Sequence, residues 1–258
     1  MGEGIDAACI GERVITDNWL RDPAEPENIN KTGYFGSERD GGFAEYTTIP
    51  ARNAIAIRSE LTDAELATFS CSYSTAEGML SRANVTSGDT VLVPGASGGV
   101  GGALVQLAKR RGARVIAMAS EAKHDEVARL GPDLILPRAP ADLRRSLRAE
   151  TITVVADVVG GPYWPKLIDI LERGGRYTCS GAIAGPMVEL DLRRFYLRDL
   201  TFTGSTVIDP AVTRRLVRYI EAGDITPNLA ATYPLEELRE AQAAFIAKTH
   251  SGNIVVTP

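Results

Sequence analysis

Residues 90–120 read TVLVPGASGGVGGALVQLAKRRGARVIAMAS, and this stretch decides the fold. An apolar run of strand length at 90–94 leads into a glycine-rich turn, which is followed by a helical pattern with apolar residues three and four apart. A second apolar run at 115–119 closes the stretch. Two strands joined by a helix over so short a distance lie parallel in one sheet. The stretch therefore predicts a strand–helix–strand unit.

The glycines of the turn indicate a ligand. Backbone N–H groups at a helix N-terminus attract a pyrophosphate, and any side chain there holds the phosphates away. Gly98 and Gly99 leave this space open, and Ser97 precedes them. Gly101 lets the helix pack closely, while Ala96 takes the first position of the usual G-x-G-x-x-G pattern. A glycine-rich turn alone is often only a turn, but both flanking strands are present here, so we predict a dinucleotide-binding Rossmann unit.

The alternation of strand and helix continues beyond this unit. Further apolar runs occur at 133–138, 153–159 and 176–181. A helix through Leu167 and Leu171 is expected to stop at Gly174 and Gly175. These runs predict an α/β fold, with a doubly wound parallel sheet.

The segments on either side of the sheet have a different pattern. Short extended pieces are expected in the first eighty or so residues, at 11–16, 43–49 and 53–58. After Pro210 the pattern predicts a helix ending near Gly223, a second helix from about Pro234 to Lys248, and a last strand in 253–258. The chain thus combines a β-rich start with a sheet of the Rossmann type.

Composition narrows the class of protein. The net charge of -5 and the absence of a dense Lys or Arg run argue against nucleic acid as a partner. No stretch reaches the roughly 18 apolar residues of a membrane helix, and the start has no signal-peptide pattern. Three dispersed cysteines and no CxxC pair predict free thiols, no zinc lobe and a cytoplasmic location.

The end of the second strand of the unit bears on the choice of cofactor. NAD-binding proteins usually place an acid there, on the adenosine ribose, but this chain has Ala119 and Ser120. Ser120 can donate to a 2′-phosphate and Lys123 can neutralise it, which favours NADP(H). Two alternatives stay open, because Glu121 could accept from a ribose and Lys123 could be an ordinary solvated lysine.

Several segments occur in the order found in one family. These are GERVI (11–15), GGFAEYTTIP (41–50), SCSYSTAEGML (70–80), the turn ASGGVG, DVVGG (157–161), SGAIAG (180–185), LTFTGSTV (200–207) and SGNIVVTP (251–258). Together they resemble the medium-chain dehydrogenase/reductase superfamily, in particular its quinone oxidoreductase-like and zinc-type alcohol dehydrogenase-like members. The resemblance covers nearly the whole chain.

This resemblance implies a division of the chain. Residues 1–71 would be part of a GroES-like catalytic domain, 72–207 the Rossmann coenzyme domain, and 208–258 a return to the catalytic domain. Relatives have a longer catalytic domain before GERVI, so we expect a shortened chain, a wrongly chosen start, or a chain that works with another.

The resemblance also implies roles for individual residues. Thr75 would lie near the nicotinamide and Val100 would cover its ring, although a helix cap and a core position are equally ordinary explanations. Further cofactor contacts are expected at Gly160, Gly181, Ala182, Ser205 and Asn253. Relatives commonly form homodimers by pairing an edge strand that LTFTGSTV resembles, and the run has no Lys or Pro that would discourage pairing.

Two residues before the turn are candidates for chemistry. In zinc-type relatives the position of Cys71 supplies one of three protein ligands to a catalytic zinc. One thiolate cannot hold the ion, so we expect Cys71 to be a small buried apolar residue and expect no zinc. Tyr73 is a candidate donor to a substrate oxygen, although a packed tyrosine with its hydroxyl at the edge is the commoner case.

Three functions are compatible with these observations. The first is NADP(H)-dependent transfer of hydride between nicotinamide and a quinone, an enone or another small carbonyl or alcohol. The second is a zinc-type alcohol dehydrogenase whose metal ligands are missing from this chain. The third is a dinucleotide-binding protein without turnover. A metal assay separates the second from the first, and turnover separates both from the third.

Overall fold

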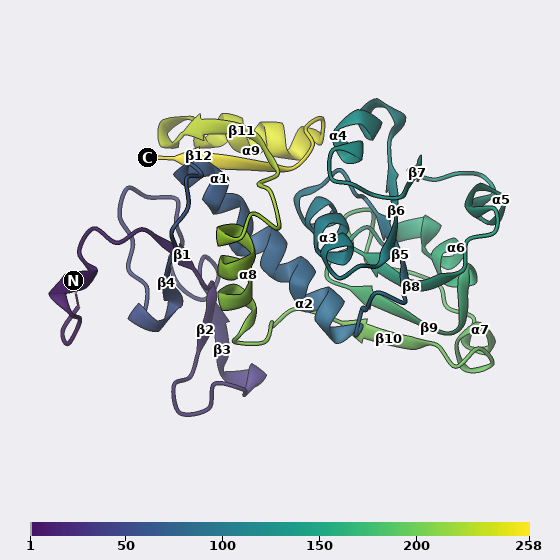
Figure 1. Cartoon of the computed structure of the whole chain (residues 1–258), viewed down its shortest axis with the longest axis horizontal. Coiled ribbons are helices and arrows are strands. Elements are labelled where there is room, and N and C mark those ends of the chain that lie inside the picture. Colours follow the sequence, from purple (N-terminus) through teal and green to yellow (C-terminus); the bar gives the residue numbers. More distant parts are fainter. Residues whose placement is uncertain (1) are drawn as a thin grey trace.

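The centre of the molecule is a parallel sheet of six strands. The computed structural model describes residues 2–258. The strands are β5 (Thr90–Pro94), β6 (Arg114–Ala119), β7 (Leu134–Pro137), β8 (Ile152–Asp157), β9 (Leu171–Cys179) and β10 (Thr201–Gly204). Their order is β10-β9-β8-β5-β6-β7, so the chain reverses direction across the sheet beside β5 (Figure 1). This confirms the predicted doubly wound α/β fold.

Both faces of the sheet are covered, which explains its continuous apolar strands. Along β5, Val91 and Val93 face one core while Leu92 faces the other, because successive side chains point to opposite faces. One face packs against α2 (Ser74–Arg82), α3 (Gly99–Arg110) and α8 (Val212–Glu221). The other packs against α5 (Leu143–Leu147) and α6 (Trp164–Asp169). α4 (His124–Ala128) and α7 (Leu192–Tyr196) complete the crossovers.

One predicted boundary in this sheet is wrong. The helix expected to extend to Leu171 and stop at two glycines ends at Asp169. β9 already starts at Leu171 and contains Gly174 and Gly175, and its register with β8 shifts between Ile152 and Val154. The glycines therefore lie at an irregularity in a strand. Gly174 has φ +76, a backbone conformation that other residues avoid, which explains why glycine is found there.

The remaining elements form small β pairs and helices beside the sheet (Figure 1). β1 (Val14–Thr16) pairs with β4 (Ala54–Ala56), β2 (Trp19–Arg21) with β3 (Thr32–Tyr34), and β11 (Leu229–Pro234) with β12 (Asn253–Thr257). The helices are α1 (Asp63–Thr68), a π-helical segment (Phe69–Tyr73) and α9 (Leu238–Ala247). The strands β2, β3 and β11 were not predicted.

The expected extended piece at 43–49 forms no strand. Phe43 and Tyr46 are exposed by 66% and 89%, and no strand of the described residues pairs with this segment. An apolar–polar alternation becomes a strand only where a neighbour satisfies its backbone groups. Its residues lie on the surface of the β-rich part instead.

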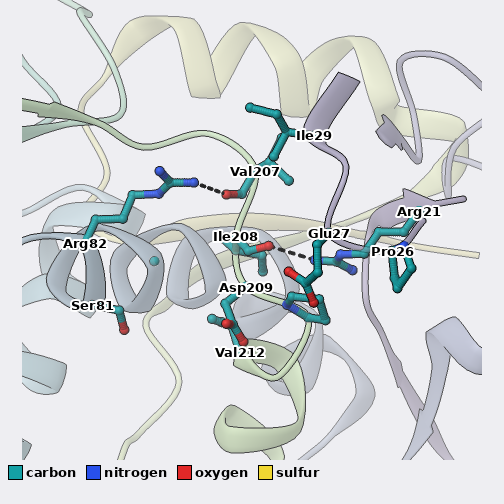
Figure 2. Close-up of a pocket in the computed structure, with 12 residues that line it drawn as sticks. Arg21, Pro26, Glu27, Ile29, Ser81, Arg82, Val207, Ile208, Asp209 and Val212 are labelled. Atoms are coloured by element: carbon teal, nitrogen blue, oxygen red, sulfur yellow. Dashed lines mark hydrogen bonds between the residues drawn. The ribbon is translucent and has the colours of Figure 1, made fainter. Parts of the chain in front are cut away.

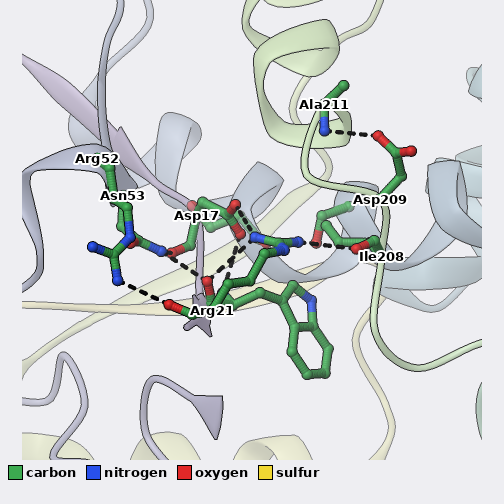
Figure 3. A network of polar contacts seen from close by, with 10 residues as sticks. Asp17, Arg21, Arg52, Asn53, Ile208, Asp209 and Ala211 are labelled. Carbon is green, nitrogen blue, oxygen red and sulfur yellow. Dashed lines mark hydrogen bonds and ion pairs between the residues drawn. The ribbon is translucent and has the colours of Figure 1, made fainter. Parts of the chain in front are cut away.

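A buried ion pair ties β2 to the connection between β10 and α8 (Figure 3). The Arg21 guanidinium donates to the Asp17 carboxylate at 2.7 Å and to the carbonyl of Ile208 at 2.9 Å. Asn53 donates to the carbonyls of Asp17 and Trp19 at 2.7 and 2.9 Å. A buried charge is stable only when it is paired, so these bonds hold the β-rich part against the sheet in one arrangement.

Candidate cofactor site

The turn after β5 builds an open cradle at the N-terminus of α3. Gly98 is the N-cap of the helix and Gly99 its first residue. A β-carbon on Gly98 would meet only the Gly95 carbonyl oxygen, at 3.5 Å, so space lies open there. A β-carbon on Gly101 would lie 2.1 Å from that same oxygen. Gly98 is thus free for a ligand, whereas Gly101 is required for the close contact between helix and turn that the sequence predicted.

The C-terminal part of the chain completes this cradle. Gly252 donates its N–H to the Ser97 carbonyl at 2.8 Å, which forms a bridge between Gly98 and Gly252. Asn253 Oδ1 accepts from the Ser72 hydroxyl at 2.6 Å. A β-carbon on Gly99 would lie 2.3 Å from Asn253 Oδ1 and 2.6 Å from Ser72 Oγ. Two polar side chains therefore face the first turn of α3, and the site needs glycine at position 99.

Ser72 was not identified from the sequence. It lies in the π-helical segment, a geometry that is frequent at functional sites. Its partner Asn253 is 181 positions away in the chain. Sequence spacing carries no signal for such a contact, and the only clue was that SCSYSTAEGML and SGNIVVTP both belong to the family order.

The end of β6 carries a lysine that is held in place. Lys123 Nζ donates to the carbonyls of Lys248 and His250 at 2.9 and 2.5 Å. Burial lowers the pKa of Lys123, the nearby Glu126 opposes this shift, and the charge of Arg138 adds to it. The interpretation of Lys123 as a solvated lysine is therefore wrong. Its ammonium links the end of β6 to the loop that carries Gly252 and Asn253, and one of its three N–H bonds remains for a ligand.

Two neighbours complete the surroundings of this lysine. Ser120 starts the short 3₁₀ turn after β6 and its side chain is half-buried, whereas Glu121 is exposed. His250 Nδ1 is buried and has no hydrogen-bond partner among the described residues. Burial and the charges of Lys123 and Lys248 lower the pKa of His250. The region thus offers a hydroxyl, an ammonium and an imidazole.

The ends of β8 and β9 hold two loops together. The buried Asp157 carboxylate accepts from the N–H groups of Val159 at 2.7 Å and Gly160 at 3.1 Å, and from the Tyr177 hydroxyl at 2.9 Å. Burial raises the pKa of Asp157, although these hydrogen bonds oppose it. Gly160 has φ +61, and a β-carbon there would lie 2.9 Å from the Gly185 carbonyl oxygen. The loop before Gly161 therefore touches the loop that carries Gly181 and Ala182.

The residues expected at the nicotinamide end differ in access. Gly181 is half-buried and Ala182 exposed. Ser205 is 2% exposed, donates its N–H to the Cys179 carbonyl at 2.9 Å, and has a hydroxyl without a partner in residues 2–258. The turn after β5 and the ends of β8, β9 and β10 all lie on the same edge of the sheet, because parallel strands end together. Open α/β sheets bind their ligands at this edge.

Tyr73 is not placed to contact a substrate. It is fully buried, and its hydroxyl donates to the Thr226 carbonyl at 2.5 Å and accepts from Gln106 Nε2 at 2.9 Å. Both hydrogen-bonding capacities are used inside the protein. The candidate role as a substrate donor is therefore wrong, and Tyr73 joins the π-helical segment to α3.

Comparison with known proteins finds similar structures that align with the whole chain. The sequence pattern of the zinc-binding dehydrogenase family matches residues 99–222. A thermostable, cobalt- and zinc-bound alcohol dehydrogenase of Pyrobaculum aerophilum is 32% identical with a TM-score of 0.88, and the alignment covers 100% of this chain and 79% of that one. This chain belongs to the medium-chain dehydrogenase/reductase superfamily.

Two further relatives of this medium-chain oxidoreductase extend the comparison. A structure provisionally named an alcohol dehydrogenase, from Sinorhizobium meliloti, is 48% identical with a TM-score of 0.95, over 100% of this chain and 72% of that one. The acryloyl-coenzyme A reductase of Metallosphaera sedula is 29% identical over 100% of this chain and 79% of its own length. Alcohol dehydrogenases and an acryloyl-coenzyme A reductase are thus both similar to this chain.

The environment of Cys71 differs from the one that the sequence predicted. Cys71 is exposed, so the prediction of a small buried residue is wrong. It lies beside the Tyr34 hydroxyl, which also accepts from Asn18 Nδ2 at 3.3 Å. Burial first, and then the neighbouring Cys71, raise the pKa of Tyr34. Across residues 2–258 no three His, Cys, Asp or Glu side chains are placed to hold a metal ion, so Cys71 alone does not fit the zinc site of the family and we derive no step through zinc.

Thr75 and Val100 flank the same edge. Thr75 is half-buried in the first turn of α2, and Val100 is half-buried and packs on the core below α3. The core explanation of Val100 therefore holds in part, since one side of its side chain is packed and the other is accessible.

None of the described helices is long and apolar enough to cross a membrane.

A separate hollow of about 310 Å³ lies between residues 26–29, α2 and the connection to α8 (Figure 2). Arg82 donates to the Val207 carbonyl at 2.7 Å and Arg21 to the Ile208 carbonyl at 2.9 Å, so the two arginines reach this connection from different elements. Glu27 and Asp209 also line the hollow. Its charges balance, and it contains none of the predicted cofactor residues.

Proposed function

We propose that this chain is an NADP(H)-dependent oxidoreductase that transfers hydride between nicotinamide and a quinone, an enone or another small carbonyl or alcohol. The observation that carries the proposal is the open space at Gly98, where α3 begins at the ligand-binding edge of a doubly wound sheet; the space at Gly99 is already filled by Asn253 and Ser72. A pyrophosphate fits there because the first N–H groups of α3 have no other partner in residues 2–258 and the helix dipole favours an anion.

The residues present fit a dinucleotide along the edge of the sheet. Ser97, Gly98 and Gly99 would hold the pyrophosphate through their backbone. The Ser72 hydroxyl donates to Asn253 Oδ1 and Asn253 Nδ2 donates to the Asn228 carbonyl, so this pair would support the first turn of α3 beside the ligand. When bound, the nicotinamide supplies or accepts the hydride. Thr75 and Val100 would orient the ring, while the loops at Gly160, Gly181, Ala182 and Ser205 would limit water on its other side. The protein's contribution is positioning.

The environment of Lys123 supports NADP(H) rather than NAD(H). A 2′-phosphate adds negative charge near the end of β6, where Lys123 and Ser120 can donate to it. The exposed Glu121 beside them could instead accept from an unphosphorylated ribose. The half-buried His250 imidazole adds a polar group on the same side.

The proposed substrates are compounds that can accept a hydride without a metal ion bound by this chain. An enone, a quinone or an enoyl thioester carries an activated acceptor carbon, so a correctly placed hydride donor is sufficient. The relatives named acryloyl-coenzyme A reductase and alcohol dehydrogenase support a panel that includes enoyl thioesters and aldehydes. NADPH and NADH oxidation with this panel tests the proposal, and binding of cofactor without turnover of any substrate would favour a dinucleotide-binding protein.

We further propose how the chain is organised and assembled. We propose that the chain divides at residues 71 and 207 into part of a catalytic domain, the coenzyme domain and a return to the catalytic domain. A homodimer is proposed through β10, whose outer edge is open in the described chain. The three free thiols suit the reducing cytoplasm.

A further inference from the structure

A second charged hollow lies at the other end of the sheet. It has a volume of about 610 Å³ and is lined by Arg144 of α5, Asp169 of α6, Leu171, Arg194 of α7 and Arg198. Leu171 is the first residue of β9, whereas Cys179, its last, reaches the cofactor edge. Eight residue steps along a strand span about 26 Å. The hollow is therefore separate from the cofactor cradle.

Three arginines and one aspartate line this hollow, and only one of the arginines contacts the carboxylate. Arg194 pairs with the Asp169 carboxylate, and Arg144 donates to the Asp169 carbonyl. Arg198 donates to the Ile168 carbonyl at 3.1 Å and forms no ion pair with the described acids. Arg144 and Arg194 are exposed and Arg198 is half-buried. Two positive charges are therefore left without a counter-charge.

None of the nearby acids described below pairs with Arg144 or Arg198. Three of them bind other partners, and the fourth forms no ion pair. Asp191 pairs with Arg193 at 2.9 Å, and Asp199 pairs with Arg173 at 2.9 Å. Asp142 caps α5 by accepting the Arg145 N–H at 3.0 Å. Glu189 and Asp191 line an adjoining hollow of about 320 Å³, and Glu189 forms no ion pair among the described residues. The surplus of positive charge is thus local to the three arginines.

The arginines also affect one another. Burial lowers the pKa of Arg198, and the charges of Arg144 and Arg194 lower it further, while Asp169 opposes this. Like charges held together in a half-buried site repel each other unless an anion joins them. Arginine presents two parallel N–H groups that match the oxygens of a phosphate.

We propose that this hollow binds a phosphate-bearing small molecule with at least two negative charges, at a site distinct from the cofactor cradle. Arg144 and Arg198 supply free N–H groups, and Arg194 stays oriented by Asp169. The balanced hollow beside Arg21 and Arg82 lacks this surplus of charge, which is why we assign the anion to the three-arginine site.

Calorimetric titration of the full chain with inorganic pyrophosphate tests the proposal. Arg144→Gln and Arg198→Gln should each weaken binding about tenfold, because each removes charge-assisted hydrogen bonds. Arg145→Gln, in the same helix but outside the lining of the hollow, is the matched control and should bind as the unchanged chain does. Gly98→Val blocks the cofactor cradle and should leave this binding intact.

Other outcomes overturn the proposal. Equal losses in Arg145→Gln would mean that only net charge attracts the anion, and loss in Gly98→Val would place the pyrophosphate at the cofactor cradle. Unchanged binding in Arg144→Gln and Arg198→Gln would remove the site altogether. Arg198→Lys keeps the charge and guards against misfolding: it should bind more weakly than the unchanged chain but more tightly than Arg198→Gln. Parallel titrations with inorganic phosphate and a sugar phosphate distinguish the possible sources of the phosphate group.

Discussion

At the scale of single residues, Gly98 and Gly101 of the turn are glycine for different reasons. Gly98 has φ -80 and an open space where a side chain would begin, so nothing in the fold requires glycine there. Gly101 meets the Gly95 carbonyl so closely that even one methyl group forces the backbone apart. Binding and folding can therefore be separated by mutation within one turn.

We expect Gly98→Val to abolish cofactor binding while leaving the melting temperature close to that of the unchanged chain, because the side chain occupies the space of the pyrophosphate. Gly101→Ala should instead cost about 2 kcal/mol of stability through overpacking. Cofactor titration and thermal unfolding of both variants check this. Gly88→Val, at an exposed turn away from the site, is the control. Cofactor binding that survives in Gly98→Val would move the site elsewhere.

Lys123 is the residue that separates the two cofactors. Lys123→Ala should weaken NADPH more than NADH, because only NADPH carries the 2′-phosphate that the ammonium can reach. Some loss should be common to both, since the ammonium also holds the carbonyls of Lys248 and His250. The quantity to measure is therefore the ratio of the two dissociation constants, with Lys166→Ala as a control. A ratio that does not change rules out the contact with the 2′-phosphate.

At the scale of elements, one carboxylate links three strands of the sheet. Asp89 lies just before β5 and is 6% exposed. It accepts from the Thr86 N–H and from the Thr153 hydroxyl of β8, both at 2.8 Å, and pairs with Arg176 of β9. Burial alone raises the pKa of Asp89, but these three partners outweigh it and the pKa is lowered below its usual 3.8. The charged form is the one that the fold favours.

Asp89→Asn should cost about 2 kcal/mol near neutral pH, because it removes a charge that accepts several hydrogen bonds. With a folded-state pKa below 3.8, the carboxylate stabilises the protein fully above 3.8, and this stability is lost as the pH falls through the folded pKa. Urea unfolding of both chains from neutral pH downward should show the difference shrinking at the acidic end. A difference that stays constant with pH would mean that Asp89 acts by shape and not by charge.

At the scale of the whole molecule, the open edge of the sheet determines the expected assembly. The Ser205 N–H points to β9, so that of Gly204, one residue earlier, points away from the sheet. Large exposed apolar side chains lie in the segment that precedes β10, at Ile183, Met187, Val188, Leu192, Tyr196 and Leu197. An unpaired edge beside apolar surface favours a two-fold partner.

We expect a dimer in light scattering at tens of micromolar concentration. Gly204→Pro removes an N–H that has no use inside the monomer, so it should weaken the dimer without disturbing β9. Gly204→Ala is the control, because no atom lies within 4 Å of a β-carbon there. A monomer in the unchanged chain, or a dimer that tolerates the proline, contradicts pairing through β10.

The sequence determined the α/β fold, because local patterns of apolar residues predict its strands. The runs that became β5, β6 and β8 are apolar on both faces, and a glycine turn follows β5. The same locality allowed Gly98, Gly99 and Gly101 to be placed at the start of a helix. These features depend on neighbours within a few residues, so spacing alone reveals them.

Only the tertiary structure decided which side chains meet. The contact of Ser72 with Asn253, the bonds of Lys123 to the loop at 248–250, and the burial of the Tyr73 hydroxyl against Thr226 all join residues far apart in the chain. The segment at 43–49 carried a strand pattern but found no partner strand, and Cys71, expected inside, is exposed. A side chain's environment is set by the elements packed around it, and local sequence does not specify those neighbours.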